Sequence, residues 1–84
     1  MAKDDNTVGI SIMAFGPIAE RLGGRQHAIE VPSGSTVREV VEGMDLREWI
    51  SFGLSVAVNG HRCTMETVVE EGIELALLPP VSGG

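Results

Sequence analysis

The chain has 84 residues, enough for one domain with a single core and too few to favour an enzyme with a deep cleft of its own. Apolar residues make up 43% of the chain, and 12 acidic against 6 basic residues give a net charge of −6. The sequence has no cluster of Lys or Arg to displace counterions from phosphates, which argues against nucleic acid or an anionic membrane as the partner. A basic patch on a partner protein fits this charge better.

Cys63 is the only cysteine, which leaves no internal disulfide and no Cys-x-x-Cys pair for a metal or for redox chemistry. We therefore expect a cytoplasmic setting and no bound metal. The opening MAKDDNTVG lacks the pattern of a signal segment, and no apolar run approaches the roughly 20 residues of a membrane span. Residues 1–7 are expected to form a disordered lead-in.

The first elements are predicted from alternation and from chain-breaking residues. Residues 8–15, VGISIMAF, alternate as a strand does. Gly16-Pro17 ends this strand, and Pro17 at a first helical position predicts a short helix that Gly23-Gly24 closes. Residues 25–31 alternate again and predict a second strand, which ends in a turn.

The main helix is predicted from a capping box. Thr36 and Glu39 have the spacing of that motif. Apolar residues then recur at the spacing of one helix face, which can lie across a sheet: Val37, Val40, Val41 and Met44. A second short helical turn, beginning after Asp45 and ending at Gly53, is expected to follow.

Three strands complete the predicted fold. They are residues 54–58, 61–64 and 73–78, and Asn59-Gly60 between the first two is a strong hairpin signal. Residues 67–71 give no clear prediction. Two strands, a main helix and three strands predict an α+β fold with a mixed sheet of about five strands covered by one main helix. This domain is expected to span residues 8–78.

Large aliphatic residues occupy one face of the predicted strands and can meet the main helix as a core. The opposite face keeps residues that are apolar or small where a solvated face would be polar: Met13, Phe15, Ala57, Ala76 and Leu78. Such a patch on a small domain predicts a protein interface. The alternative is that Phe15 and Leu78 close over the end of the sheet as peripheral core.

The last six residues, 79–84, are predicted to form an extended tail. Pro79-Pro80 have no N–H to donate to a sheet ladder, so the last strand must end near Leu78. The tail, which continues through Val81 and Ser82, can reach roughly 20 Å. Gly83-Gly84 have no Cβ, so the backbone can thread a narrow channel and present a bare carboxylate.

A bare, extended carboxylate can attack a nucleotide α-phosphate and become an acyl adenylate. If a sulfur nucleophile then captures the acyl group, the product is a thiocarboxylate. If a lysine amine captures it, the product is an isopeptide-linked protein modifier. A tail that is inert, on a domain that only binds, is the third possibility.

Four segments carry a resemblance to a known family. They are the ending LLPPVSGG, the segment VAVNG at residues 56–60, the Gly-x-Glu-x-Ala pattern at residues 72–76, and the opening IMAFGPIAERLGG. Over residues 8–84 the chain resembles the MoaD/ThiS sulfur-carrier family. Its ending is most similar to the MoaD branch, the small subunits of molybdopterin synthase.

The resemblance implies a ubiquitin-like β-grasp fold and a function. Gly84 would be adenylated by an E1-like, MoeB-like enzyme that uses ATP and Mg²⁺, and then thiocarboxylated with sulfur from a donor such as a cysteine desulfurase. The tail would enter a MoaE-like large subunit of molybdopterin synthase, where the sulfur passes to a pterin precursor. The chain itself would hold no cofactor and no catalytic side chains. A ThiS-like carrier for thiamine or another sulfur-transfer pathway, and a ubiquitin-like modifier conjugated through Gly84, remain as alternatives.

The remaining polar residues give weaker signals. His27 and His61 have no Ser, Cys or Asp partner at a suggestive spacing and are expected to be structural. Cys63 is expected to be a small strand residue rather than a nucleophile. An acidic cluster is most simply a solvated face, with steering of a basic partner as the alternative: Glu66, Glu70, Glu71 and Glu74.

Overall fold

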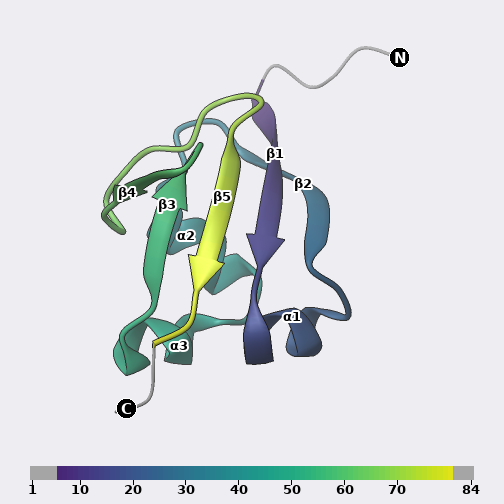
Figure 1. Ribbon diagram of the computed structural model, residues 1–84. Coiled ribbons are helices and arrows are strands. Elements are labelled where there is room, and N and C mark those ends of the chain that lie inside the picture. The colour runs from purple at the N-terminus through teal and green to yellow at the C-terminus, as the bar shows by residue number, and fades with distance from the viewer. Residues whose placement is uncertain (1–5, 81–84) are drawn as a thin grey trace.

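The computed structural model describes residues 6–80, in which a five-stranded sheet is backed by helices (Figure 1). In chain order the elements are β1 (Thr7–Ala14), α1 (Gly16–Leu22), β2 (Gln26–Pro32), α2 (Val37–Gly43), α3 (Arg47–Phe52), β3 (Ser55–Val58), β4 (His61–Cys63) and β5 (Glu74–Leu78). The predicted α+β class and the predicted order of elements are confirmed. The tail residues Val81, Ser82, Gly83 and Gly84, and most of the expected lead-in, lie outside the described residues.

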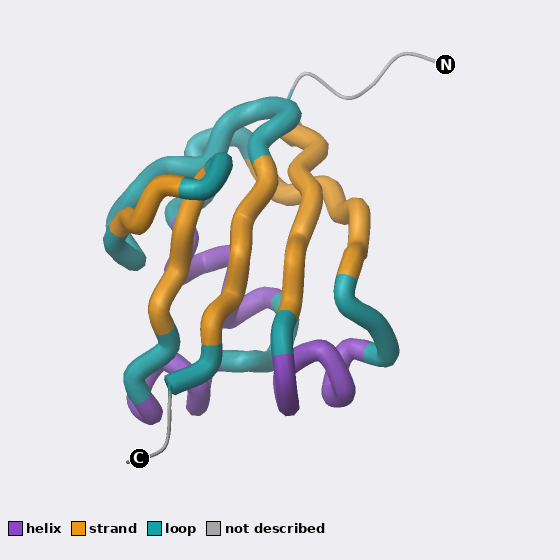
Figure 2. Tube along the Cα trace, viewed as in Figure 1, coloured by secondary structure: helices purple, strands orange, loops and turns teal. Residues whose placement is uncertain are grey.

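The sheet is mixed, with the strand order β2-β1-β5-β3-β4 (Figure 2). β1 runs parallel to β5, with Ile12 opposite Leu75 and Ala14 opposite Leu77, and the other neighbouring strands are antiparallel. The first and last strands of the chain therefore lie side by side in the middle of the sheet. Both run toward the end of the sheet where the described chain stops (Figure 1).

The strand boundaries differ from the predicted ones by about one residue. β1 begins at Thr7, which pairs with Pro32 of β2, and it ends at Ala14 because Phe15 is the N-cap of α1. Residues 67–71 form no strand, but Val68 makes an isolated bridge with Thr36. At the start of α2, Val37 N donates to Thr67 O at 2.8 Å and Arg38 N donates to Met65 O at 2.9 Å. The long connection after β4 thus holds the beginning of α2.

The capping box predicted for α2 is present. Thr36 Oγ1 accepts a hydrogen bond from Glu39 N at 3.2 Å, and Glu39 Oε1 accepts one from Thr36 N at 2.9 Å. Two amides that a helix leaves without intrahelical partners are satisfied in this way. The motif places α2 so that Val37, Val40 and Val41 are buried against the sheet.

The core lies between α2 and one face of the sheet. It gathers alternate residues of the strands with apolar residues of the helices and their flanks: Ile10, Ile12, Ala14, Ile18, Ala19, Val37, Val40, Val41, Leu46, Leu54, Val56, Val69, Leu75 and Leu77. Because side chains of a strand alternate between the two faces, this arrangement leaves the residues between them on the other face. None of the helices described between residues 6 and 80 is long and apolar enough to cross a membrane.

Candidate functional site

The face of the sheet turned away from α2, which we call the open face, carries small and apolar residues at its centre. The register places Met13 opposite Ala76 and Ala76 opposite Ala57, in one row across β1, β5 and β3. Ala57 is only 6% exposed, whereas Met13 and Ala76 are half-buried. The alternation predicted for these strands is confirmed, because their neighbours Ile12, Leu75 and Val56 belong to the core.

Phe15 and Leu78 lie at the end of the open face. They directly follow the parallel pair formed by Ala14 and Leu77, and Phe15 has extended backbone angles, so both side chains continue the alternation onto the open face. Both are half-buried, and neither belongs to the core cluster or to the partly buried residues packed against it. They therefore lie outside the core cluster, and their assignment to an interface rather than to peripheral core stays a prediction.

Two arginines stand at the sides of this apolar end. The guanidinium of Arg25, just before β2, lies over the ring of Phe15 with its Cζ 5.7 Å from the ring centroid, a cation–π arrangement. Arg62 of β4 pairs with Ala57 and donates from Nη2 to Ser55 Oγ at 3.3 Å. Ser55 pairs in turn with Leu78. Sequence reasoning did not single out either arginine.

The root of the tail rests against two glycines. A Cβ placed on Gly16 would lie 3.6 Å from Pro79 Cγ, and one on Gly53 would lie 3.7 Å from Pro80 Cβ. Gly53 has φ +104°, a conformation that L side chains rarely adopt, and it ends α3 as its C-cap. The two prolines thus leave the sheet between the first residue of α1 and the end of α3.

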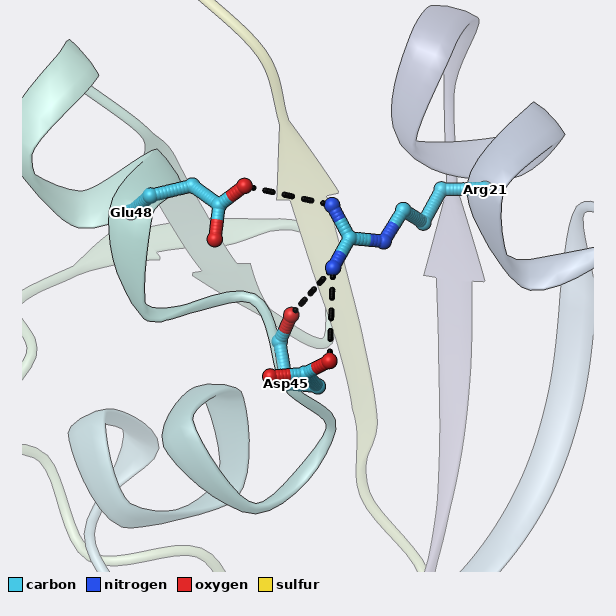
Figure 3. Close-up of polar contacts among 3 residues, drawn as sticks. All are labelled: Arg21, Asp45 and Glu48. Carbon is cyan, nitrogen blue, oxygen red and sulfur yellow. Dashed lines mark hydrogen bonds and ion pairs between the residues drawn. The ribbon is translucent and has the colours of Figure 1, made fainter.

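Arg21 links the two helices that border the tail root (Figure 3). From α1, its Nη1 donates to Glu48 Oε2 at 3.2 Å, and its Nη2 donates to the backbone oxygen of Asp45 at 3.1 Å and to Asp45 Oδ2 at 3.4 Å. All three side chains are largely exposed, so the ion pairs contribute at most about 1 kcal/mol to the free energy of unfolding. Their effect is to orient α1 against the start of α3.

His27 and Cys63 make contacts within the fold, whereas the expectation that His61 is structural stays a prediction. Nε2 of His27 lies 2.9 Å from the backbone oxygen of Gly24, and His61 is exposed at the hairpin. Cys63 is half-buried and packs against the core from β4. Within residues 6–80 no group of three His, Cys, Asp or Glu side chains is placed to hold a metal ion.

The glutamates of the predicted cluster make different contacts in the structure. Glu66 accepts from Arg38 Nη2 at 2.7 Å, and this hydrogen bond and the charge of Glu66 raise the pKa of the Arg38 guanidinium. Glu71 Oε1 accepts from Gly9 N at 2.9 Å, beside the open face. Glu74 begins β5 on the open face itself, opposite Ser11. Glu71 and Glu74 therefore lie near one another along β1, whereas Glu66 lies apart from them beside Arg38.

The structure brings the predicted interface residues Met13, Phe15, Ala76 and Leu78 together on the open face and sets Pro79-Pro80 at its end. Gly84, the residue predicted to be adenylated and thiocarboxylated, lies outside the described residues. A signal for Arg62 was present in the sequence: the Asn59-Gly60 turn fixes the hairpin register, which pairs Arg62 with Ala57. No comparable signal exists for Arg25, whose place depends on how the loop after α1 returns to the sheet.

Comparison with known proteins agrees with this geometry. The sequence matches the ThiS family over residues 12–84, most of its length. The chain belongs to the ThiS family. This ThiS-family chain is 29% identical over 85 residues to the molybdopterin synthase sulfur carrier subunit of Arabidopsis thaliana, and the match covers 96% of the chain and 88% of the relative.

Two solved structures resemble this ThiS-family chain closely. SAMP1, a small archaeal modifier protein from Haloferax volcanii, has a TM-score of 0.71 at 30% identity, and the match covers 90% of this chain and 99% of that one. One chain in the structure of the complex of subunits 1 and 2 of molybdopterin-converting factor from Helicobacter pylori matches with a TM-score of 0.62 at 26% identity, and the match covers 92% of this chain and 100% of that one. The ubiquitin-like β-grasp fold and the resemblance to the MoaD/ThiS sulfur carriers are confirmed.

Leu77 and Leu78 provide a matched pair for testing the two faces of the sheet. Leu77 is 0% exposed in the core, so Leu77→Ala should lower the free energy of unfolding by about 2–5 kcal/mol. Leu78→Ala removes the same atoms from the open face and should cost about 1 kcal/mol or less. Urea denaturation followed by circular dichroism measures both. Equal losses would show that Leu78 is part of the core and contradict the assignment of the open face.

Proposed function

We propose that the chain is a sulfur carrier and the small subunit of a molybdopterin synthase, with the carboxylate of Gly84 as the atom group that carries the sulfur. The observation that carries the proposal is the position of the tail root. Pro79-Pro80 leave the sheet at the end of the open face where Phe15 and Leu78 lie side by side. A protein that covers this face therefore receives the residues that follow Pro80.

The length of the tail is consistent with an active site that belongs to a partner protein. Four residues, 81–84, follow Pro80 in the sequence and can span at most about 14 Å. An active site that uses Gly84 must then lie within that distance of the tail root, on a partner already in contact with the domain. In the described part of the chain, His27 lies within hydrogen-bond distance of the Gly24 backbone oxygen and Cys63 packs against the core, which supports chemistry on the tail rather than on these two side chains.

The proposed activation takes place on an E1-like enzyme that binds ATP and Mg²⁺. A carboxylate oxygen of Gly84 attacks the α-phosphorus of ATP, pyrophosphate leaves, and an acyl adenylate forms. A sulfur nucleophile, such as a persulfide made by a cysteine desulfurase, then attacks the acyl carbon and AMP leaves. A thiol cleaves the remaining S–S bond and departs in a disulfide, so that the thiocarboxylate stays on Gly84.

The proposed use of the thiocarboxylate takes place in the large subunit of the synthase. The similarity to the Helicobacter pylori complex of subunits 1 and 2 supports a partner of this MoaE-like kind. The large subunit would cover Met13, Phe15 and Leu78 and take the tail into its active site. There the sulfur would pass to a pterin precursor and the carboxylate of Gly84 would be regenerated. The catalytic side chains would be those of the partners.

Formation of the thiocarboxylate is the first test. Incubation of the chain with the E1-like enzyme and the cysteine desulfurase of the same organism, ATP, Mg²⁺ and cysteine should raise its intact mass by the difference between sulfur and oxygen. Deletion of Gly84 should abolish the change, whereas Cys63→Ser should leave it intact, because the thiol of Cys63 packs against the core. An unchanged mass of the full chain would overturn the proposal.

A second candidate function is that of a protein modifier joined to lysines through Gly84. The likeness to SAMP1 at 30% identity favours it, because that relative is a small archaeal modifier protein. The chemistry is the same as far as the acyl adenylate, and the function differs only in the nucleophile that follows. The two functions can therefore be separated by their products.

Mass spectrometry of cell proteins can detect the modifier function. The last basic residue is Arg62, so trypsin would leave a long remnant, residues 63–84, on a modified lysine. A Ser82→Arg variant shortens the remnant to Gly83-Gly84, which is readily identified. Sulfur carriage without conjugation predicts that such lysines are absent from cells expressing this variant. Their presence, and their loss when Gly84 is deleted, would establish the modifier function.

A further inference from the structure

The arginines of the open face have no ion-pair partner in the described part of the chain. Arg21 pairs with Asp45 and Glu48, and Arg38 pairs with Glu66, but neither Arg25 nor Arg62 makes an ion pair within residues 6–80. Both are exposed, in a chain where acidic residues outnumber basic ones two to one. Arg47 also makes no ion pair within residues 6–80, so Arg25 and Arg62 are distinguished by their contacts with the same end of the open face.

The two arginines lie at opposite ends of one strip of residues. We define the strip as Phe15, directly after β1, Leu78 of β5 and Ser55 of β3, which follow one another across the tail end of the open face, with the apolar side chains at the Phe15 end. The Arg25 guanidinium covers the Phe15 end of the strip, and the Arg62 guanidinium bonds to the Ser55 end. β2 and β4 are four strand spacings apart, so the two arginine Cα atoms are separated by about 19 Å.

Each guanidinium is held in place yet keeps donors for a partner. A guanidinium has five N–H donors in a planar fork, and Arg62 uses one of them on Ser55 Oγ. Arg25 lies over the face of the Phe15 ring, and none of its N–H groups makes a hydrogen bond within residues 6–80. Side chains already fixed by such contacts lose less conformational freedom when they bind, which favours their use in recognition.

From this arrangement we propose that Arg25 and Arg62 determine which protein docks on the open face, by pairing with two carboxylates that flank an apolar patch on that protein. The inference rests on the proposed function, since the docking protein is the one that receives the tail. The proposal also changes the expectation, drawn from the net charge, that the partner presents a basic patch. A partner with only a basic patch would meet the two arginines with like charge, which is unfavourable.

A second copy of this chain is a poor occupant of the face. Its acidic residues could supply carboxylates, because Glu74 and Glu30 lie at the other end of the open face. Each copy carries a net charge of −6, however, so two copies repel one another. The complementary surface is therefore assigned to a different protein, with acidic groups placed locally beside an apolar centre.

Charge reversal tests the proposal, with Arg47 as a matched control. Arg47 of α3 is exposed, makes no ion pair within residues 6–80 and lies outside the open face. The probe is the molybdopterin synthase large subunit of the same organism, and its Kd is measured by titration calorimetry. The double variant R25E/R62E should raise the Kd at least about tenfold and weaken its dependence on salt, whereas R47E should change it less than about twofold.

Further measurements separate the possible outcomes. Circular dichroism and the Tm of each variant establish that it is folded, and R25K/R62K should bind with an intermediate Kd because charge remains while the planar fork is lost. Unchanged binding by the folded double variant would overturn the role of the arginines but leave the proposed function standing. Failure of the unaltered chain to bind the large subunit would overturn both. Self-association of the unaltered chain that R62E abolishes would assign the face to a second copy and overturn the proposal.

Discussion

The parallel pairing of β1 with β5 is the constraint on which the rest of the structure depends. It brings the first and last strands together in the middle of the sheet, with Ala14 opposite Leu77. Those two residues are buried in the core, and the next residue of each strand, Phe15 and Leu78, therefore lies on the open face. Pro79 then ends β5, because it has no N–H for the ladder. One pairing thus fixes the core, the open face and the point where β5 ends.

The domain and its tail have separate tasks in this account. The capping box fixes the start of α2, the core fills the space between α2 and the sheet, and the short helices α1 and α3 border the tail root (Figure 1). Pro79 and Pro80 lie beside Gly16 and Gly53, where an added Cβ would make only ordinary van der Waals contact with them. In the proposed function, a partner recognises the open face and also receives the residues that follow Pro80. In this arrangement affinity and chemistry depend on different residues.

Local patterns predicted most of the fold, whereas the charged part of the site depends on tertiary structure. Alternation placed Met13 and Leu78 on one face, and the capping box predicted where α2 begins, because both signals depend on neighbours in the sequence. The parallel pairing of β1 with β5 joins residues about 60 positions apart, and no local pattern in the sequence predicted it. Arg25 lies over Phe15 because a loop returns to the sheet there, and no local pattern encodes that position.

Transfer of sulfur from this chain to a pterin is the central claim, and one labelling experiment tests it most directly. The chain is thiocarboxylated with radioactive sulfur at Gly84, purified, and mixed in a single turnover with the synthase large subunit and its pterin precursor. The account predicts that the label moves into the pterin product and that the chain regains the mass of its free carboxylate. If all the label stayed on the chain, while the same large subunit accepted sulfur from a different carrier protein, the result would contradict the account.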